Sequence, residues 1–297
     1  MKRYAAPLVF LLPATLLILL FFVAPAATTL YLSLTDISTI TFQHPRWVGL
    51  GNYHSLLRDP FIAKILLNTG RYVGLTLLFN VGMGLLLALL SSLVRERYGN
   101  QIRAVWLLPR ILPPVVYVLI WQGFAREAPY GLISDLVGAS KNWITAQPWN
   151  VIILANGLVG ASFGMLIFTS AVRAIPQDLF YAAAVDGATT GQTVRRVVLP
   201  LLRWPILFVT AYQTLSLLTS FEYILLLTSG GPGFYTTTVW SLHAYKLALS
   251  NYFGNVQFGL GAAMAAVLVV IGVAVSLFYL RIFNFRALVG EPKVEVN

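Results

Sequence analysis

The chain alternates long apolar runs with short polar connectors. A membrane-spanning helix needs about 20 consecutive, mostly apolar residues. Six runs meet that requirement, at residues 5–32, 69–93, 104–124, 149–172, 205–227 and 258–280. The pattern therefore predicts an all-α polytopic membrane protein with six transmembrane helices.

The first run has two interpretations. Lys2 and Arg3 precede it, and Ala24-Pro25-Ala26 is similar to a signal-peptide cleavage site. The run is longer than the apolar part of a signal peptide, and five more spans follow it. We therefore expect a retained first span and keep the cleaved signal peptide as the alternative.

The least apolar long segment is 177–202, between the fourth and fifth spans. Pro176 is suited to the start of a helix, and Asp178 would complement the positive end of its dipole. Gly187 tolerates the left-handed backbone of a helix end, and Thr189 or Thr190 can cap a second helix. This segment is predicted to form a short helix, a tight turn and another helix in water.

This segment resembles the cytoplasmic loop of permease subunits of binding-protein-dependent ATP-binding-cassette importers. The family pattern is Glu-Ala-Ala, two residues, Asp-Gly-Ala and later Leu-Pro. The matching residues are Ala182, Ala183, Asp186, Gly187, Ala188, Leu199 and Pro200, while Tyr181 replaces the usual Glu. The resemblance implies that the first helix docks on an ATPase subunit. The alternative is a connector without a partner, since motif matches include false positives.

Other stretches resemble the carbohydrate branch of that family, the maltose, trehalose and glycerol-phosphate type. They are the run from Trp47 to Tyr53 followed by Asp59-Pro60, the pairs Leu108-Pro109 and Pro113-Pro114, and the turn 230–232 after the fifth span. The resemblance implies a type I importer permease fold. It divides the chain into a first span and extracytoplasmic loop (1–68), a core permease domain (69–283) with a coupling loop at 174–203, and a cytoplasmic tail (284–297).

Composition and charge agree with a membrane protein. Only 10% of residues are charged and 58% are hydrophobic, whereas soluble domains average about 25% charged. The formal net charge of +10 comes with no basic run or base-stacking module, so nucleic acid is not an expected partner. There is no cysteine, which excludes thiolate chemistry.

The distribution of Lys and Arg predicts the orientation. With both termini cytoplasmic, twelve of the 20 basic residues fall in inside segments and seven in the longer outer ones, with Arg110 left near a helix end. Positive residues favour the cytoplasmic side. We therefore expect a multi-pass protein of the cell (cytoplasmic) membrane, with the 174–203 loop inside.

Polar side chains in the fifth span are candidates for a solute path. Gln213, Ser216 and Ser220 recur at helical spacing with Thr219 beside them, so they are predicted to share a face. Neutral hydrogen-bonding groups suit a sugar, whereas an anionic solute would need Arg or Lys. The family resemblance also places sugar contacts a few residues before the Gly-Gly-Pro turn. Alternatively, these hydroxyls bond only to helix carbonyls.

Three further candidates lie in other spans. Tyr117 and Trp121, one turn apart, can form an aromatic platform in the path or a lipid-interface belt. Asn156 can line the path or join helices. Glu222 is expected near the outer interface, as an anchor or part of a gate.

No pattern supports catalysis by this chain. It lacks a phosphate-binding loop ending in Gly-Lys-Ser or Gly-Lys-Thr, so ATP and Mg²⁺ are expected in a separate ATPase and no cofactor in this chain. The resemblance implies a second permease subunit, two ATP-binding subunits, an extracytoplasmic solute-binding protein, a carbohydrate and membrane lipid as partners, and transport by alternating access. Alternatives are import of glycerol phosphate or a polyamine, or a polytopic protein without a transport role.

Overall fold

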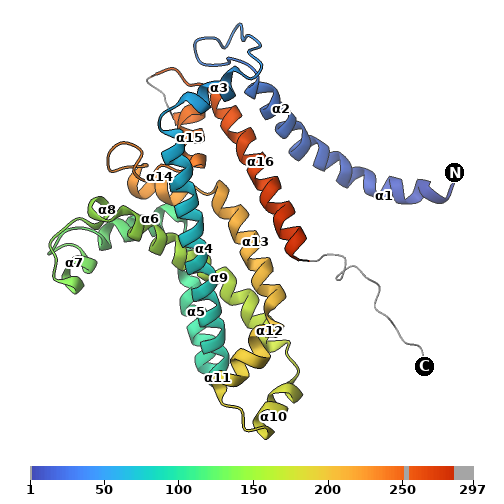
Figure 1. The fold of residues 1–297 in the computed structure, drawn as a ribbon, viewed down its shortest axis with the longest axis vertical. Coiled ribbons are helices and arrows are strands. Elements are labelled where there is room, and N and C mark those ends of the chain that lie inside the picture. The colour runs from blue at the N-terminus through green and yellow to red at the C-terminus, as the bar shows by residue number, and fades with distance from the viewer. Residues whose placement is uncertain (1, 251–253, 284–297) are drawn as a thin grey trace. The chain divides into compact units, whose positions relative to one another are not determined.

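The computed structural model describes residues 2–250 and 254–283, and these are almost entirely helical (Figure 1). The predicted tail at 284–297 lies outside the described residues. The chain forms two compact units, residues 1–63 with 240–271 and residues 64–239 with 272–297. Each unit is described separately.

The helices in chain order are α1 (Lys2–Ile18), α2 (Ala24–Ser33), α3 (Gly51–Arg58), α4 (Ile62–Leu93), α5 (Glu96–Ile111), α6 (Pro114–Phe124), α7 (Leu132–Val137), α8 (Trp143–Ala146), α9 (Pro148–Arg173), α10 (Gln177–Val185), α11 (Thr190–Thr193), α12 (Leu199–Leu201), α13 (Arg203–Thr219), α14 (Glu222–Thr228), α15 (Trp240–Tyr245) and α16 (Phe258–Ile282). Turns of π-helix at Leu19–Val23, Val194–Val198 and Lys246–Ser250 continue α1, α11 and α15. No strand occurs among the described residues.

Four of the continuous helical stretches are long and apolar enough to cross a membrane: Phe10–Ser33, Ile62–Leu93, Pro148–Arg173 and Phe258–Ile282. The pair α5 and α6 would make a fifth span, bent by 101°. The predicted span at 205–227 is not one helix, because α13 ends at Thr219 and α14 begins at Glu222. The predicted second span, 69–93, lies within α4, which begins at Ile62.

Prolines cause the bend between α5 and α6. Leu112 precedes Pro113, and Pro113 precedes Pro114, so the proline rings disfavour helical backbone at both residues. Both are extended, with ψ of 138° at each. The carbonyls of Pro109 and Arg110 also lose their usual helical partners, since residues 113 and 114 have no N–H.

In the first unit, the motif around Asn52 holds the loop after α2. The Asn52 side chain donates to the carbonyls of Ser33 and Thr35, both at 2.8 Å, and the Tyr53 hydroxyl lies 2.7 Å from Ser33 Oγ. The Gly259 N–H at the start of α16 donates to Ile37 O at 2.9 Å. Part of this sequence motif is thus explained by loop structure.

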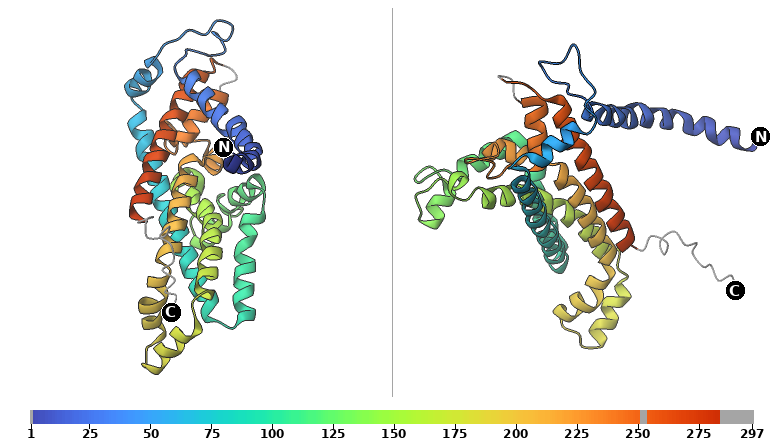
Figure 2. Two further views of the ribbon diagram at one scale, coloured as in Figure 1. Left: turned by 90° about the vertical axis from the view of Figure 1, so that its right-hand side faces the viewer. Right: turned by 45° about the horizontal axis from the view of Figure 1, so that its top comes forward.

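In the second unit, α4 packs closely on α9 through glycines. A Cβ added at Gly84 would lie 2.9 Å from the Ala161 carbonyl oxygen, and one at Gly160 would collide with the Asn80 amide. Small residues let two membrane helices approach in this way. α9 also packs against α5 and α13, which makes it the central helix of this unit (Figure 2).

Candidate functional site

The α10 segment has the geometry that the sequence predicts. Pro176 precedes the helix, and Gly187 follows it with φ of +71°. The Ala188 N–H donates to Ala183 O at 2.9 Å and the Gly187 N–H to Ala184 O at 3.1 Å. These two bonds form a Schellman motif, which closes the helix end. The predicted helix and tight turn are both confirmed.

The next helix begins two residues after this turn. Thr189 Oγ1 accepts from the Gln192 N–H, and Gln192 Oε1 accepts from the Thr189 N–H at 2.8 Å. This reciprocal pair is a capping box. Of the two candidate capping residues, Thr189 and Thr190, Thr189 is therefore the N-cap. Leu199 and Pro200 follow in α12, after the π-helical turn.

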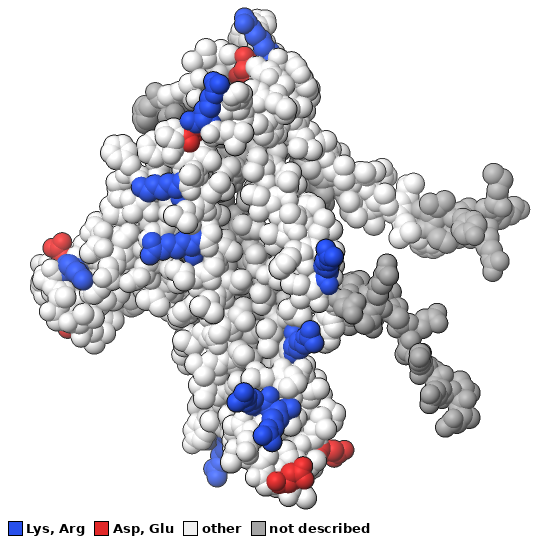
Figure 3. Space-filling view, in the orientation of Figure 1, with Lys and Arg blue, Asp and Glu red and all other residues white. Residues whose placement is uncertain are grey.

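α10 leaves its side chains largely uncovered. None of its residues is buried, and apolar Leu179, Tyr181 and Val185 are 41%, 66% and 88% exposed. Ala182, Asp186 and Gly187 are also exposed, with Ala183 and Ala188 half-buried. Basic and acidic side chains lie together at this end of the second unit, and further Lys and Arg are scattered over the rest of the face shown (Figure 3). Exposed apolar side chains on a helix beside charged residues form a surface suited to a protein partner.

The loop is fixed to the spans by one buried cluster. Ile175, before α10, packs with Val198 and Leu202, after it, and with Phe168 and Val172 of α9. Because residues on both sides of α10 pack in this cluster, the C-terminal end of α9 and the N-terminal end of α13 are held in contact at the loop.

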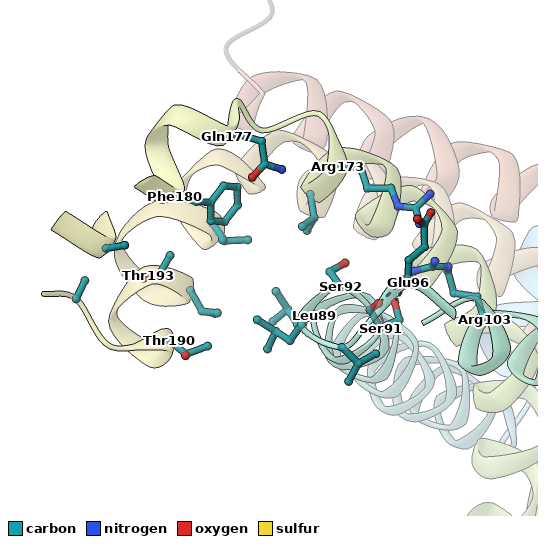
Figure 4. A pocket seen from close by; sticks show the side chains of 17 residues that line it. Leu89, Ser91, Ser92, Glu96, Arg103, Arg173, Gln177, Phe180, Thr190 and Thr193 are labelled. Atoms are coloured by element: carbon teal, nitrogen blue, oxygen red, sulfur yellow. Dashed lines mark hydrogen bonds and ion pairs between the residues drawn. The ribbon is translucent and has the colours of Figure 1, made fainter. Parts of the chain in front are cut away.

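A cavity of about 760 Å³ lies behind α10 (Figure 4). Gln177 and Phe180 of α10, Thr190 and Thr193 of α11, and Ser91 and Ser92 of α4 line it together with other residues. At its rim, the Arg173 guanidinium lies 3.5 Å from the Glu96 carboxylate. Both side chains are more than half exposed, so this pair contributes at most about 1 kcal/mol.

The polar residues within the spans fall into a buried set and an exposed set. The Gln213 side chain is buried, donates to Gly160 O at 2.9 Å and lies 3.1 Å from the Asn80 amide. Asn156, also buried, hydrogen-bonds to the Tyr72 hydroxyl. These contacts join α4, α9 and α13, so Gln213 and Asn156 hold helices together.

Replacing Gln213 by leucine should destabilise the protein without removing any exposed group. The change leaves the Gly160 carbonyl and the Asn80 amide without this partner, at a cost of about 1–3 kcal/mol. Thermal unfolding in detergent measures it, with Ser216→Ala as the control at an exposed position of the same helix. Equal unfolding temperatures for the two variants would contradict this assignment.

The predicted shared face does not extend to Ser220, while Gln213 and Ser216 remain three residues apart on α13. Gln213 is buried and Ser216 is exposed, while Ser220 lies outside the helix with ψ of 129°. The Ser220 N–H and the Thr219 hydroxyl both donate to Ser216 O, at 3.0 and 3.1 Å. Side-chain hydroxyls that compete for helix carbonyls weaken the helix. Ser216 and Thr219 stay exposed on α13, and Ser220 Oγ lies 3.4 Å from the Tyr72 hydroxyl.

The aromatic pair on α6 is part of the packed interior. Tyr117 and Trp121 are 5% and 9% exposed and pack edge to face. The Tyr117 hydroxyl donates to Ala155 O at 2.9 Å, and its ring packs edge to face on Tyr223 of α14. This burial contradicts a lipid-exposed belt. Glu222, by contrast, is exposed in the first turn of α14, where an acid complements the helix dipole.

A second aromatic group lies on the uncovered side of α13. The Phe163 ring of α9 stacks on Tyr212 at 4.7 Å, and Tyr212 stacks on Phe208 at 6.5 Å. The Arg110 guanidinium lies over Phe163, 5.5 Å from the ring centre. An arginine at the bilayer centre costs about 2.5–3.5 kcal/mol, so such residues are usually functional. The residue pattern around Arg110 does not predict this contact.

Comparison with known proteins agrees with this architecture. Residues 80–288 match a family described as "Binding-protein-dependent transport system inner membrane component". The chain is 28% identical over 284 residues to the trehalose/maltose transport system permease protein MalF of Thermococcus litoralis, covering 93% of this chain and 92% of that protein. It is 29% identical to the sulfoquinovosyl glycerol transport system permease protein SmoG of Agrobacterium fabrum, covering 93% and 89%.

The fold is also shared with a solved structure. A chain of a bacterial ABC transporter involved in the import of the acidic polysaccharide alginate superposes with a TM-score of 0.80. The two chains are 24% identical, and the superposition covers 95% of this chain and 96% of the other.

Proposed function

The chain belongs to the family of inner membrane components of binding-protein-dependent transport systems, and on this premise we propose that it is a permease subunit of an ATP-driven carbohydrate importer. A solute-binding protein would deliver the carbohydrate from outside, and the spans would expose the path to alternate sides. Similarity to the permeases of trehalose/maltose and sulfoquinovosyl glycerol transport systems supports a carbohydrate over other solutes.

The observation that carries the coupling role is the exposed apolar face of α10, held at both ends by the same buried cluster. A short helix laid into a groove is a common way for one protein to bind another. ATP binding by partner subunits would displace α10, and the shared cluster would pass that displacement to α9 and α13. Tyr181, 66% exposed where the family usually has Glu, would meet the partner through an aromatic ring.

We also propose an orientation in the membrane, from the distribution of Lys and Arg, and a lining for the solute path, from the exposed polar residues of α13. The excess of Lys and Arg in the sequence segments assigned to the inside favours both termini and α10 in the cytoplasm. Ser216 and Thr219, on the uncovered side of α13, and Ser220 at the break would line this chain's half of the path. The other half would come from a second permease subunit, with two ATPase subunits binding ATP and Mg²⁺.

Purification from the native membrane tests the proposal. The tagged chain, extracted in mild detergent, should bring with it a nucleotide-binding subunit and a second polytopic permease, identified by mass spectrometry. That complex, reconstituted with its solute-binding protein, should take up a carbohydrate only when ATP is supplied. Recovery of the chain alone from fully solubilised, intact material would contradict the importer assignment.

A further inference from the structure

We propose that the carbohydrate carried past this chain is acidic, and that Arg110 determines this specificity by pairing with its carboxylate. The inference rests on the proposed function and adds the chemical class of the solute. Its basis is a positive charge beside an uncovered row of aromatic rings, where two helices are interrupted.

Arg110 lies within the span formed by α5 and α6, in the last turn of α5 before the bend. Its guanidinium lies on the ring of Phe163, which is near the middle of α9. Among the described residues, no ion pair of Arg110 with an acidic side chain occurs. Glu222, an exposed acid just beyond the α13 break, is therefore not its ion-pair partner within this chain.

The contact with Phe163 leaves the arginine able to bind an anion. The guanidinium carbon lies 5.5 Å from the ring centre, within cation–π range, and this attraction does not use the N–H donors of the guanidinium. A carboxylate fits two of those N–H groups at once. A solute with a carboxylate would therefore supply the negative charge that the described part of this chain does not place beside Arg110.

The neighbouring groups suit a sugar ring. Tyr212 and Phe208 continue the row from Phe163 along α13, and each is 50% exposed. The C–H face of a sugar is apolar and can pack on the negative face of an aromatic ring. A glycerol phosphate has no ring to use this row, and a polyamine would be repelled by Arg110.

Hydrogen-bonding groups for sugar hydroxyls flank the row. Exposed Ser216 lies one turn beyond Tyr212 on α13, and exposed Thr219 lies in the last turn. On α5, the carbonyls of Pro109 and Arg110 lack helical donors because residues 113 and 114 are prolines. In many secondary transporters, the sites for solute and coupling ion are formed by interrupted helices of this kind.

The test uses the complete importer with its solute-binding protein in proteoliposomes. The probes are radiolabelled oligosaccharides in matched pairs, each a neutral sugar and the same sugar with one primary alcohol oxidised to a carboxylate. Wild-type protein should take up the acidic members at least tenfold faster than the neutral ones. Arg110→Gln should lower acidic uptake at least tenfold, and Arg110→Lys should restore part of it.

Arg71→Ala is the matched control, because Arg71 is also an exposed arginine over a ring, 5.2 Å from the centre of Trp149. It should keep acidic uptake within twofold of wild type. ATP-driven uptake of neutral sugars alone, or unchanged acidic uptake by Arg110→Gln, would overturn the inference and leave the proposed function standing. Failure of every pair to enter with ATP would overturn both. The wild-type preference decides the question if Arg110→Gln is not recovered.

Discussion

Replacing Gly187 by proline is expected to abolish ATP-coupled uptake, by more than tenfold, while the chain still inserts into the membrane. Gly187 has φ of +71°, and proline holds φ near −65°. Proline also removes the N–H that donates to Ala184 O. The turn after α10 would then open, and the docking face would no longer be held in place. Uptake and substrate-stimulated ATP hydrolysis in proteoliposomes measure the loss.

Gly191 provides the control in the same loop. It is exposed, and a Cβ added there meets nothing within 4 Å. Gly191→Ala should therefore transport like wild type. Normal uptake by Gly187→Pro would rule out α10 as the coupling element, provided that both variants co-purify with equal amounts of the ATPase subunit.

Replacing Gly160 by leucine is expected to prevent recovery of folded protein. Its Cβ alone would collide with the buried Asn80 amide, and the Gly160 carbonyl accepts from Gln213. Overpacking a close helix contact costs about 1–3 kcal/mol and sometimes more. The α4–α9 contact and the polar contacts next to it would be lost together. Yield of monodisperse protein after detergent extraction measures the effect.

Gly82 of α4 tests whether any leucine replacing a glycine has this effect. It is exposed and has open space around its Cα. Gly82→Leu should be recovered in wild-type amounts. Normal recovery of monodisperse Gly160→Leu would mean that α4 and α9 do not approach each other as closely as described.

Local sequence signals were enough to predict the α10 loop. Pro176, Gly187 and Thr189 act on the backbone within a few residues of themselves, so their effects do not depend on the rest of the fold. The bend after Leu112 follows for the same reason, from two consecutive prolines.

The break after Thr219 could not be predicted in this way. No proline or glycine occurs between Thr219 and Glu222, and the apolar run continues on both sides. At the interruption, the Ser216 carbonyl accepts from both the Ser220 N–H and the Thr219 hydroxyl, a contact that no apolar pattern predicts. The sequence therefore predicts one helix for the fifth span and places Ser220 on a helical face, whereas Ser220 lies just after the end of α13.

Tertiary packing determined the roles of Gln213 and Arg110. Helical periodicity places Gln213 near Ser216, but only the position of α9 shows that Gln213 is buried against Gly160. Arg110, Phe163 and Tyr212 come from three helices, and nothing in their spacing along the chain brings them together. Sequence alone thus identified the elements of the site more reliably than the partners of its side chains.

The connection between α10 and α11 contains no residue outside a helix-capping motif. The Schellman motif ends at Ala188, the capping box begins at Thr189, and Ile175 and Leu202 on the two flanks lie in one cluster. A connection this short would transmit a displacement of α10 to α9 and α13, and a displacement of those helices to α10. Coupling between two binding sites is equal in both directions as a free energy. Under the proposed function, solute bound beside α13 would therefore change the affinity of the partner ATPase for nucleotide. Nucleotide would change the affinity for solute by the same factor.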